Sequence, residues 1–402
     1  MNAVPAQGPR LAVVLSHPTQ YYSPWFQSLR ASTSIEFRVF YLWDFGVEAK
    51  TDPEFGTPIR WDVDLLSGYD SEFVPNIAAH PGAESFYGFD NPGLTRRLAQ
   101  WRPDALLLFG YNWASHLRAA FWARCHRVPI LFRGDSTLIG RENPRARVRV
   151  ALTLLFSQFS AFLYVGAANK DYFRAFGVRP RKLVFSPHSV NAGLFDRDDP
   201  AHRAEAQRLR RGLGIGEKTK VVLFAAKLVP VKQPMLLLAA FLRLKPRDTA
   251  LVFVGDGSEK PFLEAAASKG EAAPGQNGIH FLPFANQSEM PSRYLLADIF
   301  VLPSRADSWG LAVNESMHMG VPALVSDRTG CQRDLVTDGE TGWVFTFDDP
   351  SSLGSALSRA LSDCEDPLRR AAIRSAVGQR IAGYTYKQTT DGLLKAMGGL
   401  SA

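Results

Sequence analysis

Cysteine is scarce in this chain of 402 residues, which contains only Cys125, Cys331 and Cys364. The three are far apart and lack the spacing of metal-ligand pairs, so the sequence predicts neither a disulfide framework nor a structural zinc site. Proteins without such cross-links are typical of reducing compartments, and we therefore expect a cytoplasmic protein.

Long hydrophobic runs are also missing. The polar start MNAVPAQGPR is followed by LAVVL, an apolar run that is too short for a signal peptide. The stretch 150–168 has no charged residue and approaches the length that spans a bilayer. Because it contains Thr153, Ser157, Gln158 and Ser160, we interpret it as the end of a helix followed by the strand AFLYVG.

Basic residues exceed acidic ones by a modest margin, which gives a net charge of +7. No basic motif is interleaved with aromatic residues, so nucleic acid is not expected as a partner. The excess lies in residues 1–195, and its densest cluster precedes an apolar helix in 141–156 and consists of Arg141, Arg145, Arg147 and Arg149. A basic amphipathic helix can lie on an anionic membrane surface, here the inner face of the plasma membrane. An ordinary solvated helix face explains the same pattern, and both interpretations stay open.

Short apolar runs, separated by helix-length segments, recur along the chain. Six of them lie in the first half (LAVVLS, FRVFYL, ALLLFG, PILFRG, AFLYVG and LVFSP) and six in the second (VVLFAA, ALVFVGDG, IHFLPF, IFVLPS, PALVSD and GWVF). Continuous apolar runs indicate strands that are buried on both faces of a parallel sheet. Two sets of six predict an α/β protein with two doubly wound domains. The apolar rhythm breaks at NAGLFDRDDPAHRAEAQRLRRG, where we expect the linker.

Ligands of such sheets bind beyond the carboxyl ends of the strands. The segment FVLPSRADSWGLAVNESMHMGVP predicts a strand at 299–303, a loop, and a helix that starts around Ser308–Leu311. Exposed amides of Trp309, Gly310 and Leu311 at the helix start would bind an anion. Asp307 would lie on the loop, and Glu315 in the first or second turn of the helix, where the dipole favours its ionised form. An anion site beside two carboxylates suits a phosphate that carries hydroxyl groups.

Two more strand ends carry informative residues. In LFAAKLVPVKQP, Lys227 ends a strand and Lys232 follows on the same loop, a pair of cations that suits a diphosphate. In VFVGDGS, Gly255 and Asp256 lie in a loop whose glycines indicate a close backbone approach. A third strand-end loop, around Phe284 to Asn286, follows IHFLPF.

The first half of the chain offers candidates for the opposite wall of a cleft. Ser16, His17 and Gln20 lie on the first strand-to-helix loop. His17 can position an acceptor or a phosphate, or simply hydrogen-bond within the loop. The segment 52–76 is expected to be an ordered loop region near the acceptor. Its Asp62-x-Asp64 resembles a metal-binding pair, but Trp61 and Leu65 favour a strand flank, and no metal is expected.

Taken together, AAKLVPVK, VGDG, ADIFVLPS, DSWGLAVNE and GVPALVSDRTGCQRDLVTDGETGWVF resemble the donor-binding domain of retaining glycosyltransferases with the GT-B fold, family 4. The resemblance is strong over residues 220–346 and weaker over the terminal GYTYKQTTDGLLKAM. The chain departs from the family pattern at four positions: Asp307 stands in place of Glu, Lys227 in place of Arg, Trp309 in place of Phe and Ala226 in place of Gly. Where many members carry a histidine beside the donor sugar, this chain has LFRGDS, with Arg133 or Asp135 in that place.

The resemblance implies two Rossmann-like domains that face each other across a cleft. The acceptor-side domain would comprise residues 1–195 and the C-terminal helix at about 381–402, and the donor domain residues 196–380. It implies a nucleotide sugar as donor, with Lys227, Lys232 and the loop amides on the diphosphate, Glu315 on the ribose and Asp307 on a hexose. For such a donor, the loop around Phe284 to Asn286 is our candidate for nucleobase selection. A sugar or a lipid-linked molecule would be the acceptor, and no cofactor is implied.

Other functions of the same fold remain open at this point. A nucleotide-sugar epimerase would be expected to need no separate acceptor. A glycan phosphorylase would need a pyridoxal cofactor, for which no lysine has a convincing setting. An inactive relative could act as a membrane-surface partner through the basic 141–156 segment. The substitutions at Asp307 and Lys227 conserve charge, which favours an active transferase.

Overall fold

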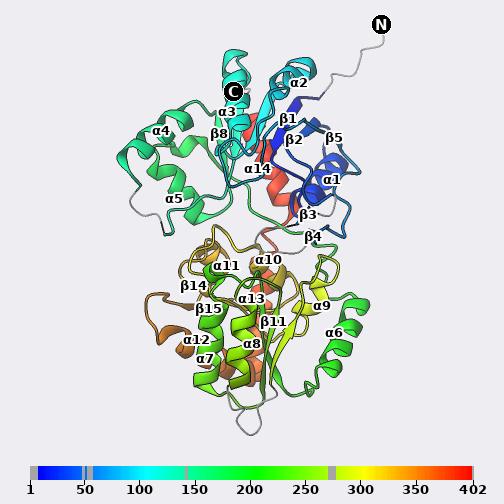
Figure 1. Ribbon diagram of the computed structural model, residues 1–402, viewed down its shortest axis with the longest axis vertical. Coiled ribbons are helices and arrows are strands. Elements are labelled where there is room, and N and C mark those ends of the chain that lie inside the picture. The colour runs from blue at the N-terminus through cyan, green and yellow to red at the C-terminus, as the bar shows by residue number, and fades with distance from the viewer. Residues whose placement is uncertain (1–7, 48–49, 52–57, 141–143, 270–277, 401–402) are drawn as a thin grey trace.

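The computed structural model describes residues 8–47, 50–51, 58–140, 144–269 and 278–400. These form two lobes, one above the other in Figure 1, each built around its own parallel sheet. The carboxyl ends of the strands in both sheets are the edges at which ligands of doubly wound folds bind. A short antiparallel pair of strands, β3 (Lys50–Thr51) with β4 (Pro58–Ile59), is separate from both sheets.

The upper lobe contains a sheet of seven parallel strands in the order β5-β2-β1-β6-β7-β8-β9. Their bounds are β1 Arg10–Leu15, β2 Glu36–Tyr41, β5 Asp70–Phe73, β6 Ala105–Phe109, β7 Ile130–Arg133, β8 Ala161–Tyr164 and β9 Leu183–Phe185. Around them lie α1 Tyr22–Ser32, α2 Leu94–Trp101, α3 Ala114–Cys125, α4 Ala146–Ser157, α5 Ala167–Ala175 and the 3-10 turn η1 Pro180–Lys182. Strand β1 is buried on both faces because Ala12 and Val14 join one core cluster whereas Leu11, Val13 and Leu15 join the other.

The lower lobe contains six parallel strands in the order β12-β11-β10-β13-β14-β15. Their bounds are β10 Lys220–Ala225, β11 Thr249–Val254, β12 Ile279–Leu282, β13 Ile299–Leu302, β14 Ala323–Ser326 and β15 Gly342–Phe345. The helices are α6 Pro200–Gly212, α7 Pro234–Leu244, α8 Lys260–Lys269, α9 Met290–Tyr294, α10 Leu311–His318, α11 Gln332–Leu335, α12 Ser352–Glu365 and α13 Pro367–Ile381, with the 3-10 turn η2 at Pro230–Lys232.

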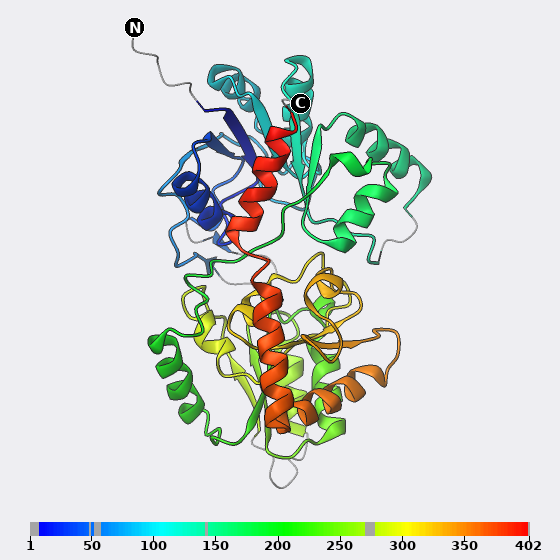
Figure 2. The same ribbon diagram turned by 180° about the vertical axis from the view of Figure 1, so that it is seen from behind.

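The last helix, α14 (Tyr386–Gly398), leaves the lower lobe and packs on the upper sheet (Figure 2). It lies against β8, β9 and α1. Its buried Thr390 accepts a hydrogen bond from the Trp25 indole at 3.0 Å, and Leu393 is fully buried in the same cluster. The lobes are therefore joined twice, by the linker before α6 and by the segment before α14.

Each of the twelve apolar runs in the sequence forms a strand, which confirms the prediction of buried parallel strands. The seventh strand of the upper sheet, β5, was not predicted. It lies at the sheet edge, and its residues DSEF are half-buried or exposed, so it lacks the apolar run of a buried strand. The predicted strand flank at Trp61 and Leu65 is wrong, because the chain there forms bends and turns.

The uncharged stretch 150–168 is the end of α4 followed by β8, as predicted. No helix in the described ranges combines the length and the hydrophobicity needed to cross a bilayer.

Candidate functional site

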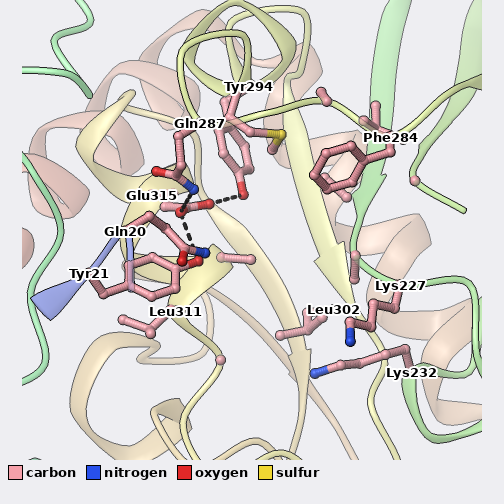
Figure 3. Close-up of a pocket in the computed structure, with 18 of the residues that line it drawn as sticks. Gln20, Tyr21, Lys227, Lys232, Phe284, Gln287, Tyr294, Leu302, Leu311 and Glu315 are labelled. Atoms are coloured by element: carbon pink, nitrogen blue, oxygen red, sulfur yellow. Dashed lines mark hydrogen bonds between the residues drawn. The ribbon is translucent and has the colours of Figure 1, made fainter. Parts of the chain in front are cut away.

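The main candidate site is a pocket of about 420 Å³ at the carboxyl ends of the lower sheet's strands. Residues from both lobes line it. The upper lobe contributes Gln20, Tyr21 and Trp61. The lower lobe contributes residues from several strand ends and from α10: Ala225, Ala226, Lys227, Lys232, Val254, Gly255, Phe284, Ala285, Gln287, Met290, Tyr294, Leu302, Asp307, Gly310, Leu311, Ala312 and Glu315. In Figure 3, the two lysines, Glu315 and Phe284 occupy three different corners.

Glu315 is the buried acid of this pocket, 3% exposed on the second turn of α10. The Tyr294 hydroxyl donates to its Oε2 at 2.7 Å, and the Tyr21 hydroxyl and the Gln287 amide donate to Oε1 at 3.1 and 3.3 Å (Figure 3). Burial raises the pKa of the Glu315 carboxyl, and the three donors offset part of that shift. Burial and the neighbouring Glu315 charge raise the pKa of both tyrosines, so both stay protonated donors. Tyr21 belongs to the upper lobe, and this bond therefore ties the two lobes together at the acid.

The buried carboxyl predicts a pH-dependent stability. Because its pKa in the folded protein is raised, the native state binds more protons than the unfolded state as the pH rises from about 4.5. The contribution of Glu315 to stability is therefore full below the unfolded pKa and is lost as the pH rises through the folded pKa. Glu315→Gln removes this titration. We expect the difference in urea midpoint, native minus variant, to decrease from pH 4.5 to pH 8.

The exposed Glu264→Gln serves as the matched control for this pH series, since Glu264 lies on the outer surface of α8. Its midpoint should follow that of the native protein at every pH. A native-minus-Glu315→Gln difference that increases with pH would contradict the expectation, because it would mean that the three donors lower the pKa of Glu315 overall.

Cations and a second acid occupy another corner of the pocket. The Lys232 amine lies 2.5 Å from Asp307 Oδ2, and Figure 3 shows Lys227 beside it with both amines directed toward the cavity. The Asp307 side chain is only 10% exposed, and its Oδ1 accepts a hydrogen bond from the Trp309 amide at 3.2 Å. This corner can hold a polyanion with the lysines and a hydroxyl with the carboxylate, close to one another.

The start of α10 agrees with the prediction, but one of the three amides assigned to the anion site does not face the pocket. The helix begins at Leu311, and Gly310 before it has φ +92°. A Cβ on Gly310 would also meet Thr329 and Leu302 at 3.0 and 3.1 Å, so this position requires glycine. Gly310 and Leu311 line the pocket as predicted, but Trp309 does not. Its amide is taken by Asp307, and its ring is buried, with the indole donating to Asn314 at 2.7 Å. Trp309 supports the loop from its buried side and does not line the pocket. This corrects its assignment as an anion-binding residue.

The Gly255-Asp256 loop also has an internal role that the sequence did not reveal. A Cβ on Gly255 would lie 2.3 Å from the carbonyl oxygen of Ala226, so the close approach is between two loops of the protein. Asp256 pairs with Lys260 at 2.6 Å and accepts the Phe284 amide at 3.1 Å. Gly255 and Ala226 line the pocket. Asp256 is not among the lining residues, and it holds the Phe284 loop in place through the Phe284 amide.

Of the candidates on the first upper loop, the structure brings only Gln20 to the pocket. The His17 ring packs edge-on against Trp43 and Phe45, and its Nδ1 lies 3.1 Å from the Ser16 hydroxyl. Burial lowers the pKa of His17 to about 4, so the ring is neutral at neutral pH. Ser16 and His17 therefore form an internal loop contact, and a neutral ring is a poor phosphate ligand.

Arg133 and Asp135, the two candidates after β7, have different positions. Arg133 is 1% exposed, and its guanidinium donates to the carbonyls of Ser186 and Pro187 at 2.8 and 3.0 Å. It holds the upper lobe together, which corrects the expectation that it faces the cleft. Asp135 does reach the other lobe, because its Oδ2 accepts the Ser308 hydroxyl at 2.8 Å and lies 3.8 Å from His188 Nε2. Burial would raise the pKa of Asp135, but these partners lower it overall.

Several pocket residues escaped the sequence analysis. Tyr21 directly follows the predicted Gln20, and Gln287 follows the Phe284 loop. Both could have been predicted from their positions close to a strand end. Tyr294 reaches the pocket from α9, and nothing in its local sequence indicates that role. Trp61 lies after β4, in a segment that was expected near the acceptor, and it lines this pocket.

The basic helix of 141–156 is only partly described, since Arg141 lies outside the described residues. Helix α4 exposes Arg147 and Arg149, with Arg145 just before it. Val148, Val150 and Leu154 of the same helix are 41%, 59% and 63% exposed. The described part of this segment therefore exposes both basic and apolar side chains.

Comparison with known proteins gives a consistent result. Residues 205–377 match the family model described as glycosyl transferases group 1. The chain is 31% identical over 265 residues to D-inositol 3-phosphate glycosyltransferase of Geodermatophilus obscurus, covering 64% of this chain and 56% of that protein. It is 29% identical to a GDP-mannose-dependent phosphatidylinositol monomannoside mannosyltransferase of Mycolicibacterium smegmatis, covering 61% and 63%. The match spans about half the length of most of these curated relatives.

Solved structures match over nearly the whole chain. Anabaena HepE in complex with UDP and glucose has a TM-score of 0.71 at 18% identity, covering 97% of this chain and 100% of that one. Sucrose-phosphate synthase from Thermosynechococcus elongatus has a TM-score of 0.72 at 16% identity, covering 98% and 99%. At these identities the likeness establishes the fold. Residues 205–377 therefore resemble a group 1 glycosyl transferase domain, and the chain as a whole has the two-domain GT-B fold.

Proposed function

We propose that this protein is a retaining glycosyltransferase of family 4 that moves a hexose-type sugar from a nucleotide diphosphate sugar to an acceptor hydroxyl. The observation that carries the proposal is one pocket, lined mostly by the matched domain, that combines two lysines, Asp307 and the buried Glu315 with the aromatic rings of Trp61 and Phe284. These are the groups that a diphosphate, two sets of hydroxyls and a base need. The solved complexes of HepE with UDP, and with UDP-glucose, support a donor of this class.

Each group has a role in donor binding. Lys227 and Lys232 would hold the diphosphate as point charges. Glu315 would accept hydrogen bonds from the ribose hydroxyls, and Tyr21 would yield part of that carboxylate when the donor enters. Asp307 would accept from the hexose hydroxyls while its charge is balanced by Lys232, 2.5 Å away.

The reaction follows from the same arrangement. The bond between the anomeric carbon and the diphosphate oxygen breaks, and an oxocarbenium-like centre forms. The acceptor oxygen bonds to that carbon from the side that the diphosphate leaves, which retains the configuration, and its proton passes to the departing phosphate. The two lysines stabilise the charge that develops on the diphosphate, which is the kind of preorganised term that usually dominates catalysis.

We further infer that the acceptor binds where Asp135, His188 and Ser308 meet, at the junction of the lobes beside Asp307. A hydroxyl-rich acceptor suits the carboxylate of Asp135. The exposed basic and apolar surface of α4 supports a lipid-borne acceptor and peripheral binding to the inner face of a plasma membrane. The names of the curated relatives include an inositol phosphate and a phosphatidylinositol mannoside, which fits either type of acceptor.

A thermal-shift screen with UDP, GDP, ADP, TDP and their sugar conjugates tests the proposal. A ligand at a hundred times its dissociation constant stabilises the folded protein by about 2.7 kcal/mol, which is visible in the melting temperature. We expect one nucleotide family to shift the native protein and to lose its effect in Glu315→Ala. Sedimentation with anionic vesicles, compared with Val150→Asp, tests the membrane part separately.

The outcomes also separate the alternatives. No shift with any nucleotide in a folded sample would support a non-enzymatic partner role and contradict the proposal. Binding followed by inversion of a donor hydroxyl, without transfer to any acceptor, would indicate the epimerase.

A further inference from the structure

A loop of the upper lobe clasps the lower lobe beside the pocket. The side chain of Asn286 donates to the Arg60 carbonyl at 2.7 Å, and its Oδ1 accepts the Asp62 amide at 3.3 Å. The Asp62 carboxylate in turn accepts the Ser288 amide at 3.3 Å and the Ser288 hydroxyl. We call residues 60–62 together with 286–288 the clasp. Both segments of the clasp contribute donors and acceptors. The clasp therefore fixes the position of Trp61, which lies at its centre.

Trp61 is held from the other side by its own lobe. Its amide donates to the Gly46 carbonyl at 3.3 Å, and its ring edge lies so close that a Cβ on Gly46 would be 2.7 Å from Trp61 Cδ1. Gly46 has φ +85°, which also favours glycine there. The indole therefore has little freedom, and one part of it lines the pocket.

The Trp61 ring lies next to the ring of Phe284, which belongs to the lower lobe. The ring centroids are 6.3 Å apart with an interplanar angle of 55°, and both rings are half-buried and line the pocket. Phe284 is positioned by the bond of its amide to Asp256, which Lys260 holds. An aromatic corner is thus built from both lobes, and each ring is fixed by hydrogen bonds of its neighbours.

The charged corners of the pocket suit the diphosphate and the hydroxyl groups of the donor, which leaves one component of the donor for the aromatic corner. The lysines suit the diphosphate and the buried Glu315 suits hydroxyl groups, whereas the aromatic corner has no charge among its lining side chains Trp61, Phe284 and Ala285. A flat, weakly polar ring system is the ligand group that such surfaces stabilise by stacking. In a nucleotide sugar that group is the nucleobase.

We propose that Trp61 is a nucleobase-binding residue: it forms one aromatic wall of the base site, the adjoining Phe284 ring continues that wall, and Asp62 is its positioning residue. The inference rests on the proposed function and deepens it. The base site is then incomplete in the donor domain alone, and base binding holds the two lobes in the arrangement that places the acceptor-side Tyr21 and Asp135 near the donor.

Isothermal titration of the native protein, Trp61→Phe and Trp61→Ala with UDP, GDP and pyrophosphate tests this assignment. We expect Trp61→Ala to weaken the preferred nucleoside diphosphate by about 5- to 100-fold, the range of lost base stacking, and to leave pyrophosphate binding unchanged. Trp61→Phe should retain most of the affinity, because it keeps an aromatic face. The nucleotide-induced change in tryptophan fluorescence should decrease in Trp61→Phe, since the reporting indole is gone.

Two further measurements keep the outcome decisive. In transfer assays Trp61→Ala should raise KM for the donor and change kcat at saturating donor by less than about threefold. Asp62→Ala should weaken the nucleotide less than Trp61→Ala, and the double variant should be no weaker than Trp61→Ala alone, because Asp62 acts through the indole. Phe121→Ala, which removes a 73% exposed ring on α3, is the matched control and should bind nucleotide as the native protein does.

Unchanged nucleotide affinity in a folded Trp61→Ala protein would overturn the assignment. An equal loss for pyrophosphate would also overturn it, because Trp61 would then only support the fold. If the native protein itself binds no nucleotide, the donor site of the proposed function fails, a result that differs from both of these.

Discussion

Replacing Lys232 with alanine is expected to slow sugar transfer by about a hundred- to a thousandfold. Lys232 is fixed at the end of η2 by its 2.5 Å contact with Asp307, so its charge faces the place from which the diphosphate departs in the proposed function. Removing one preorganised donor to a developing negative charge typically costs about 3–4 kcal/mol in the transition state. The variant also leaves Asp307, 10% exposed, without its cation next to an anionic substrate. Steady-state kinetics with saturating donor measures the effect as a fall in kcat.

Two variants sharpen this experiment. Lys232→Arg keeps the charge and should recover much of the rate, whereas the exposed Lys218→Ala, in the turn before β10, should transfer sugar at the native rate. A loss below about fivefold in Lys232→Ala would show that Lys227 alone carries the diphosphate, and it would contradict the role given to the pair.

Replacing Arg133 with alanine is expected to lower the stability of the upper lobe by about 3–5 kcal/mol. The guanidinium is 1% exposed and satisfies the carbonyls of Ser186 and Pro187 as well as the Ser186 hydroxyl, between β9 and α14. Its removal leaves buried acceptors unpaired, at about 1–3 kcal/mol each, and opens a cavity beside Tyr22 and Trp25. Burial disfavours the charged guanidinium and lowers the pKa of Arg133. Removing this buried charge therefore offsets part of the loss.

Native-state hydrogen exchange of the amides in β7 and β9 measures this loss without assuming that both lobes unfold together. Arg96→Ala on the exposed side of α2 is the control, and it should change stability by less than about 0.5 kcal/mol. The loss of stability in Arg133→Lys should lie between the losses in Arg133→Ala and Arg96→Ala. An ammonium group keeps the charge but cannot donate to both carbonyls at once as the planar guanidinium does. A change below 1 kcal/mol in Arg133→Ala would show that water replaces the guanidinium.

The strands of both sheets were predictable because burial on both faces of a parallel sheet demands continuous apolar residues, and this demand is local. The same holds for Lys227, Lys232, Asp307 and Glu315, which follow strand ends that a doubly wound topology gathers at one edge. The edge strand β5 was not predicted, because an edge strand that is partly exposed does not require a continuous apolar run.

The lobe interface is where local sequence stops being informative. The Tyr21 bond to Glu315 joins residues 294 positions apart, and the clasp of Asp62 with Ser288 joins residues 226 apart. Each partner alone is an ordinary polar residue on a loop, and only the docking of one lobe on the other makes it part of a site.

The direction of a side chain is decided in the same way. Arg133 ends a strand at the correct edge, but the sheet turns its side chain inward, where the two carbonyls that follow β9 accept hydrogen bonds from it. Asp135, two residues later, reaches Ser308 instead. Gly255 is required because the Ala226 carbonyl approaches it, a contact set by the packing of two loops. The sequence by itself determined the two sheets and the charged corner of the pocket, because those depend on local burial and chain order. The tertiary structure decided the aromatic corner, the pairing of Glu315 and the inward turn of Arg133, because those depend on which surfaces meet.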